Sequence, residues 1–110
     1  MKKIFFISLV LLVTGCANVA QTGSVSQAYK SFAANDYKKT LELITQAELF
    51  STTTPELKAE LTYLKAQALE EMGQSETAET LYEYLTDQHK DSQYGYLAAK
   101  WFEKKDESIN

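Results

Sequence analysis

The chain has 110 residues, of which 45% are apolar and 24% are charged, and this length suits one domain with a modest core. Its fifteen acidic residues outnumber its eleven lysines, so the formal net charge is −4, and it contains no arginine. An acidic chain without guanidinium groups, which read phosphate and guanine, is poorly suited to nucleic-acid binding. The one cysteine can form no disulfide within the chain, so the fold must be stabilised by its core alone.

The first fifteen residues have the parts of a secretory leader. Lys2 and Lys3 supply positive charge, and residues 4–13 are apolar with one exception. This run is shorter than the ~20 apolar residues that a transmembrane helix needs, but it suits the hydrophobic region of a signal peptide. Residues 13–15 (Val-Thr-Gly) then directly precede Cys16.

This arrangement resembles the lipobox of bacterial lipoproteins. In that family the cysteine thiol receives a diacylglyceryl group, the leader is cut before the cysteine, and the new N-terminus is acylated. The resemblance implies that residues 1–15 are a lipoprotein signal peptide and that Cys16 is lipidated. Several acyl chains hold a protein firmly, at about 0.8 kcal/mol per buried methylene. The alternative is a buried structural cysteine after a plain signal peptide, which the small, polar residues after Cys16 disfavour.

The resemblance also predicts a location. Ala17 follows the cysteine where proteobacterial lipoproteins retained in the inner membrane carry aspartate. The expected place is therefore the periplasmic face of the outer membrane.

A tether and two helices are expected next. Residues 16–24 are the cysteine followed by mostly small, polar residues, which suits a flexible link. A helix is predicted over residues 25–34, with Ser24 as its N-cap, because apolar residues recur there at helical spacing. Asp36 is expected to cap a second helix over residues 37–50.

Three more helices follow in the prediction. The third has Pro55 in its first turn and ends at Gly73, a typical C-cap residue. Ser75 is expected to cap the fourth, and a fifth occupies residues 92–105, before a frayed tail at 106–110. No segment alternates with period two, so the predicted class is all-α, with short connections that make successive helices antiparallel.

The two expected helix–turn–helix joints are similar to each other. Each has a turn residue that tolerates positive φ, a capping residue, and a small residue at the first inward position of the next helix. These features resemble the tetratricopeptide repeat (TPR). The closer matches are Ala66, Gly73, Ala78 and Tyr82, and the looser ones are Ala28, Asn35, Thr40 and Ile44.

The TPR resemblance implies a short stack of antiparallel helical hairpins. About two repeats and a C-terminal capping helix would occupy residues 25–105. The joints are offset by 38 residues, whereas the family's repeat has 34. A plain helical bundle is the alternative.

No catalytic constellation is recognisable in the sequence. His89 is the only histidine and lies in a polar turn, so metal-ligand spacing is absent. Glu70-Glu71 and Asp106-Glu107 are adjacent pairs that point apart on a helix, unlike paired catalytic carboxylates. We therefore expect no enzyme, no cofactor and no metal site.

The seven tyrosines suggest a binding surface instead, because tyrosine suits sites that are apolar on one side and wet on the other. In TPR-like stacks the first helix of each hairpin lines a concave groove. The resemblance assigns to this groove Tyr29, Phe32, Tyr63, Gln67, Glu70, Tyr96 and Lys100. The alternative for each tyrosine is packing in the core or between helices.

The sequence thus predicts a non-enzymatic scaffold anchored in the outer membrane, which binds another envelope protein as a helix or extended peptide. Two alternatives stay open. One is a secretin pilotin, a lipoprotein that carries a pore subunit to the outer membrane. The other is a module for small ligands or glycans, although a chain without arginine holds anionic ligands poorly.

Overall fold

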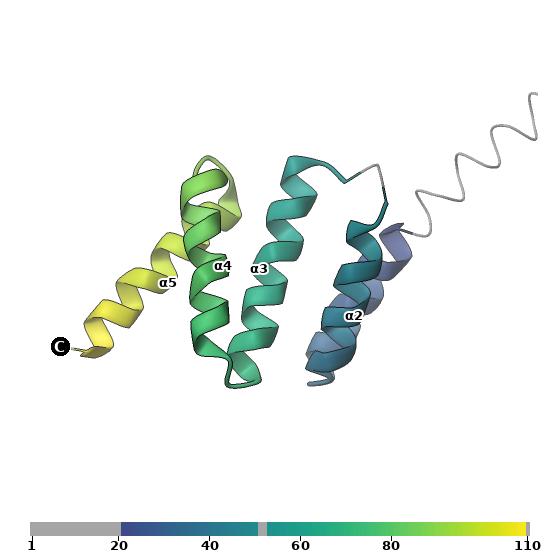
Figure 1. Ribbon diagram of the computed structural model, residues 1–110, viewed down its shortest axis with the longest axis horizontal. Helices are drawn as coiled ribbons and strands as arrows, with labels where there is room; N and C mark the ends of the chain where they lie inside the picture. Colours follow the sequence, from purple (N-terminus) through teal and green to yellow (C-terminus); the bar gives the residue numbers. More distant parts are fainter. Residues whose placement is uncertain (1–20, 51–52, 110) are drawn as a thin grey trace, which may run out of the picture.

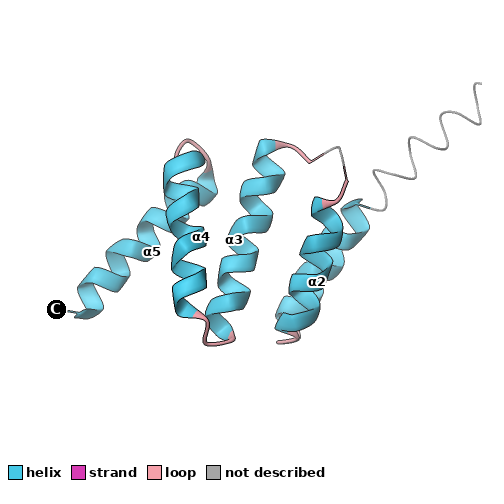
Figure 2. Cartoon of the chain, in the orientation of Figure 1, coloured by secondary structure: helices cyan, strands magenta, loops and turns pink. Residues whose placement is uncertain are grey.

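The computed structural model describes residues 21–50 and 53–109. These residues form a helix over residues 21–33, followed by α2 (Tyr37–Glu48), α3 (Pro55–Glu71), α4 (Ser75–Gln88) and α5 (Gln93–Ile109), and they contain no strand. Successive helices run in alternating directions, with the connections at alternate ends of the stack (Figure 1, Figure 2). The predicted all-α class and its antiparallel helical hairpins are confirmed.

The helix α3 is the centre of the stack, since it packs against α2 on one side and against α4 and α5 on the other. Two groups of buried residues lie on these two sides. The aliphatic cluster consists of Ala28, Leu43, Ile44, Ala47, Leu61 and Leu64. The aromatic cluster consists of Ala59, Ala66, Leu69, Ala78, Tyr82, Leu85 and Ala98, with Tyr63, Tyr94, Trp101 and Phe102 among the side chains packed against it.

The two sharp turns within the hairpins form as the sequence predicts. Asn35 and Gly73 have φ of 63° and 81°, the left-handed values that asparagine and glycine tolerate best. The Asp36 carboxylate accepts a hydrogen bond from the Lys39 amide at 3.3 Å and so caps α2. The Thr54 hydroxyl does the same for α3 by accepting from the Leu57 amide at 3.1 Å.

Two details of the predicted helix ends differ. Gln74, not Ser75, is the N-cap of α4, and its side chain makes no capping hydrogen bond. The Gly73 turn is tight enough for the Gln74 carbonyl to accept from the Ala78 amide at 3.1 Å, so Ser75 already lies inside the helix. The second helix ends at Glu48, two residues before the expected position.

The first helix begins earlier than predicted. Residues 21–24 are helical, so the flexible-tether prediction is wrong for them, and Ser24 is not an N-cap. The physical reason is a tertiary contact that the sequence pattern does not reveal. The buried Gln21 side chain donates to the Ala47 carbonyl at 3.2 Å and to the Thr53 hydroxyl at 3.0 Å, which fixes this turn beside the end of α2.

The last helix continues further than predicted. Residues 106–109 belong to α5, so the prediction of a frayed tail is wrong for them. Lys105 pairs with Glu79 of α4, and this contact ties the last turns of α5 to the stack.

None of the described helices has both the length and the apolar character needed to cross a membrane. The predicted signal peptide, Cys16, most of the tether and Asn110 lie outside the described residues.

Candidate partner-binding site

One face of α3 stays accessible although its neighbours cover most of the helix. Glu56, Glu60, Tyr63, Gln67 and Glu70 are exposed or half-buried. At 3.6 residues per turn, these five positions fall within an arc of roughly 80° around the helix axis. They are flanked on one side by the first helix and on the other by α5.

Tyr29 joins this face from the first helix. Its hydroxyl donates to Glu60 Oε1 at 2.7 Å, and its side chain is 40% exposed. Partial burial raises the pKa of Tyr29, and its hydrogen bond to the Glu60 carboxylate raises it further. The hydroxyl therefore remains a neutral donor at any physiological pH.

Tyr94 joins the face from α5. The Tyr63 and Tyr94 rings lie 5.7 Å apart between centroids, and Tyr63 also meets the buried Tyr82 ring edge-on at 5.9 Å. Burial raises the pKa of Tyr63, and the Glu70 charge adds to this effect. For Tyr94, burial raises the pKa first and the Glu60 charge second. The negative charge of a glutamate thus raises the pKa of each of these two neighbouring tyrosines.

Glu70 is held at the other end of the face by two neutral donors. The Tyr82 hydroxyl and Trp101 Nε1 both donate to its Oε2, at 3.1 and 2.8 Å. The two donors are themselves fixed, because the Trp101 and Tyr82 rings stack with centroids 4.5 Å apart. Burial and the Glu70 carboxylate raise the pKa of Tyr82, so this hydroxyl also stays protonated.

These contacts link the first helix and α5 to one face of α3, and we refer to the residues involved as the tyrosine–glutamate strip. Its members are Tyr29, Glu60, Tyr63, Glu70, Tyr94 and Trp101. Of the residues predicted for the groove, Tyr29, Tyr63 and Glu70 belong to the strip. Gln67 lies on the same face of α3, between Tyr63 and Glu70.

Three other predicted residues lie elsewhere. Phe32 packs against the aliphatic cluster and meets Tyr37 edge-on at 5.4 Å, so it has a packing role. Tyr96 is 60% exposed, and the Lys100 ammonium lies 5.5 Å from its ring centroid and 3.3 Å from Glu103. Because Tyr96 follows Tyr94 by two residues, it faces roughly the opposite side of α5. The packing of α5 onto the aromatic cluster fixes that rotation.

Three strip members were missed as groove residues by the sequence analysis. The i, i+4, i+7 spacing of Glu56, Glu60 and Tyr63 could have indicated Glu60. Tyr94 and Trp101 also pack against the aromatic cluster, so their apolar character alone points to the core. Only the structure reveals that the Trp101 indole nitrogen reaches a carboxylate of α3.

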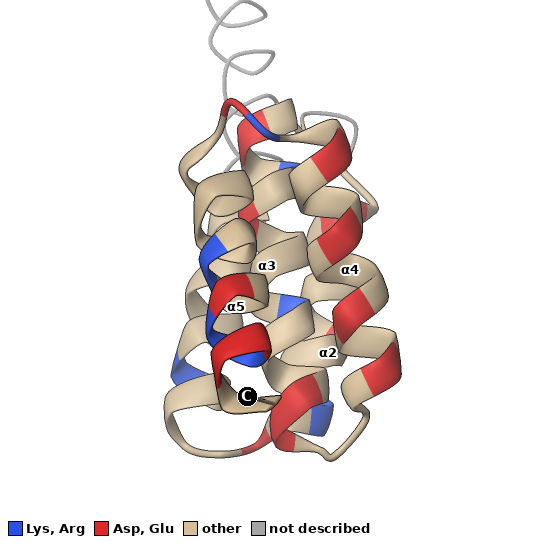
Figure 3. Cartoon of the chain, turned by 90° about the vertical axis from the view of Figure 1, so that its left-hand side faces the viewer, with Lys and Arg blue, Asp and Glu red and all other residues tan. Residues whose placement is uncertain are grey.

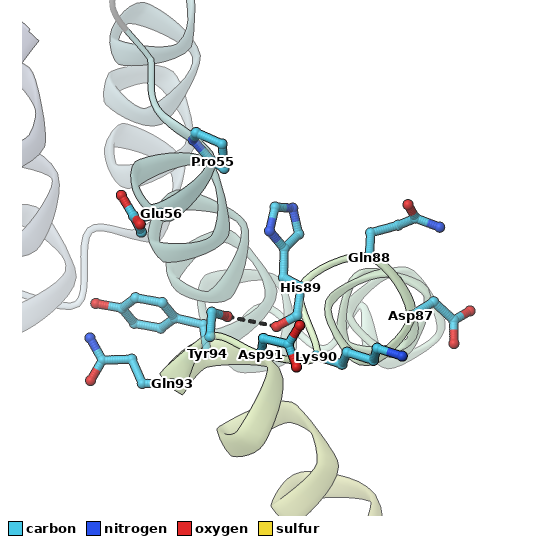
Figure 4. Close-up of a pocket in the computed structure, with 10 residues that line it drawn as sticks. Pro55, Glu56, Asp87, Gln88, His89, Lys90, Asp91, Gln93 and Tyr94 are labelled. Carbon is cyan, nitrogen blue, oxygen red and sulfur yellow. Dashed lines mark hydrogen bonds between the residues drawn. The ribbon is translucent and has the colours of Figure 1, made fainter.

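A hollow of about 500 Å³ adjoins the strip between the start of α3 and the α4–α5 connection (Figure 4). Its lining includes Glu56, His89 and Tyr94, with Glu56 and Tyr94 at the same edge. His89 Nε2 lies 3.4 Å from the Tyr84 hydroxyl, and the His89 carbonyl accepts from the Ser92 hydroxyl at 2.7 Å. Residues 21–50 and 53–109 contain no group of three or more side chains arranged to hold a metal ion.

Charges are unevenly distributed over the stack. Helix α4 carries Glu76, Glu79, Glu83 and Asp87 and has no lysine. The acidic positions recur along α4, whereas α5 carries lysines as well as acids (Figure 3).

Comparison of the chain with protein-family models, with curated proteins and with solved structures found no match.

Proposed function

We propose that this protein is a non-enzymatic scaffold, anchored by lipid at Cys16 to the periplasmic face of the outer membrane. In this proposal the tyrosine–glutamate strip binds another envelope protein, presented as an extended peptide or a helix. The leader and the lipobox-like residues before Cys16 support the anchor.

One observation carries the binding part of the proposal. Three helices that are not consecutive in the chain contribute Tyr29, Tyr63 and Tyr94 to one accessible surface beside two fixed carboxylates. Tyrosine and tryptophan are among the side chains that contribute most to the binding energy of protein interfaces. Anchoring would raise the local concentration of the scaffold at the membrane, so that a weak contact suffices.

The anchor is tested by metabolic labelling with radioactive palmitate. Label should enter the wild-type chain and be absent from Cys16→Ser. Absence of label from the wild-type chain refutes the anchor.

The surface is tested by photo-crosslinking in cells. A photoreactive amino acid at Tyr29, which is in the strip, should give a defined adduct, identified by mass spectrometry. The matched control is the same amino acid at Tyr96, which is also an exposed tyrosine but lies outside the strip. Identical adducts from both positions, or none from Tyr29, argue against the strip as the binding surface.

A further inference from the structure

The charges of α3 are separated between two sides of the helix. Glu56, Glu60 and Glu70 lie on the accessible face described above. Lys58 and Lys65 lie roughly 150° away from Glu60 around the helix axis. The accessible face of α3 is therefore acidic, although the helix as a whole carries both signs.

Glu60 and Glu70 form no ion pair within 4 Å in the described part of the chain, although the Lys105 ammonium lies 5.4 Å from the Trp101 ring centroid. Within the described part of the chain, the ion pairs are Lys100–Glu103 and Lys105–Glu79. Glu60 and Glu70 instead accept from neutral hydroxyl and indole donors. A carboxylate offers about four acceptor positions, so each glutamate keeps free capacity for a further donor.

The neighbouring aromatic groups prepare these carboxylates for a cation. The Tyr29 hydroxyl fixes Glu60, while Tyr82 and Trp101 fix Glu70, so less side-chain freedom is lost on binding. The half-buried rings of Tyr63 and Tyr94 lie alongside. Aromatic rings pack well against the aliphatic stems of lysine and arginine, and their faces attract the charged ends.

We propose that the tyrosine–glutamate strip recognises a cationic peptide segment, with one lysine or arginine on Glu60 and another on Glu70. This inference rests on the proposed scaffold function and names the chemistry of its partner. The two glutamates are ten residues apart on α3, which is about 15 Å along the axis. In an extended peptide, residues i and i+4 point to the same side and lie about 13 Å apart. The expected recognition element is therefore an extended segment with basic residues at i and i+4.

The test uses the full chain in detergent micelles and short synthetic peptides. Three peptides share one neutral background and carry two lysines at i and i+4, two adjacent lysines, or two glutamates at i and i+4. The first should bind at least about tenfold more tightly than the other two, as expected for charge-assisted hydrogen bonds. Nuclear magnetic resonance should place the shifted signals at Tyr29 and Tyr63.

Matched variants separate the strip from the overall acidity of the protein. Glu60→Gln with Glu70→Gln removes two charges but keeps oxygen acceptors for Tyr29, Tyr82 and Trp101, so the fold is retained. This pair should abolish the preference for the i, i+4 dilysine peptide. Glu76→Gln with Glu83→Gln makes the same change of charge on α4 and should leave binding within about twofold of wild type.

Several results would overturn the inference. These are equal loss of binding in both double variants, equal binding of the three peptides, or no shift of strip signals with any of them. Binding of the acidic peptide at the strip would refute cation recognition but leave the scaffold proposal intact. Dilysine binding in vitro without an adduct from Tyr29 in cells would support cation recognition by the strip but refute the scaffold proposal.

Discussion

The two buried clusters on either side of α3 differ in chemistry and in what they present at the surface. The aliphatic cluster has no side-chain polar atom among its members, so none of its side chains can hydrogen-bond to a group at the surface. In the aromatic cluster, Tyr82 is only 2% exposed, yet its hydroxyl reaches Glu70. A core built with tyrosine and tryptophan thus also fixes polar groups at the surface, which an aliphatic core cannot do.

The most destructive test of this comparison is Tyr82→Ala. Removing the buried ring should lower the free energy of unfolding by about 4 kcal/mol, and it should also release Glu70 and Trp101. Ile44→Ala in the aliphatic cluster should cost about 3 kcal/mol and leave the strip intact. Urea unfolding measures both losses, and Trp101 fluorescence of the folded variants should change for the first alone. A fluorescence change in Ile44→Ala would mean that the two clusters are not independent.

The next largest effect is expected at Gly95, in the first turn of α5. An added Cβ would lie 2.1 Å from the His89 carbonyl oxygen, so α5 would have to move away from the end of α4. Gly95→Ala should destabilise the fold by about 3 kcal/mol. Gly23→Ala is the control, because nothing lies within 4 Å of its added Cβ. Because alanine favours the helix more than glycine, Gly23→Ala should stabilise the fold by up to about 1 kcal/mol. The melting temperature should therefore rise for Gly23→Ala and fall for Gly95→Ala.

Alkaline pH should weaken the fold through the tyrosines. The pKa values of Tyr82 and Tyr29 are raised in the folded state, mainly by burial and then by Glu70 and Glu60. The folded state therefore holds these protons more tightly than the unfolded state. The contribution of these two protonated tyrosines to the free energy of unfolding is fully present below pH ~10, the ordinary pKa of tyrosine. It is lost as the pH rises through their pKa values in the folded state.

Phenylalanine variants separate these two tyrosines. Tyr82→Phe should flatten the alkaline decline of the urea midpoint more than Tyr29→Phe, because Tyr82 is the more buried ring. An identical decline in wild type and both variants would assign the effect to other groups.

The smallest effect is expected for Tyr29→Phe near neutral pH. Its hydrogen bond to Glu60 joins the first helix to α3 but is exposed, so its loss should cost less than about 1 kcal/mol. Hydrogen exchange should quicken in the first helix and remain unchanged in α4. Faster exchange in α4 would show that the hydrogen bond stabilises the whole stack.

Much of the fold could be predicted because local chemistry determines it. The positive φ of Asn35 and Gly73, the Asp36 cap and the position of Pro55 all follow from single residue types. The start of the first helix could not be predicted, because it depends on Gln21 reaching Ala47 and Thr53 across the stack. Sequence periodicity contains no information about such contacts.

The candidate site was predictable only in part for a related reason. Helical spacing on α3 located Tyr63, Gln67 and Glu70 on one face. The rotation of α5 depends on how its residues pack against α3 and α4, and it places Tyr96 and Lys100 away from Tyr29 and Tyr63. The lipidation of Cys16 and the identity of the partner stay predictions.

The early start of the first helix leaves little slack for an anchored molecule. Only residues 17–20 separate Cys16 from Gln21, and five consecutive Cα–Cα steps span at most roughly 18 Å when fully stretched. With a linker of this length, the edge of the stack that contains Gln21 would lie close to the lipid headgroups in the proposed anchored form. A partner would then have to come to the bilayer, since the protein could not extend far toward the cell wall.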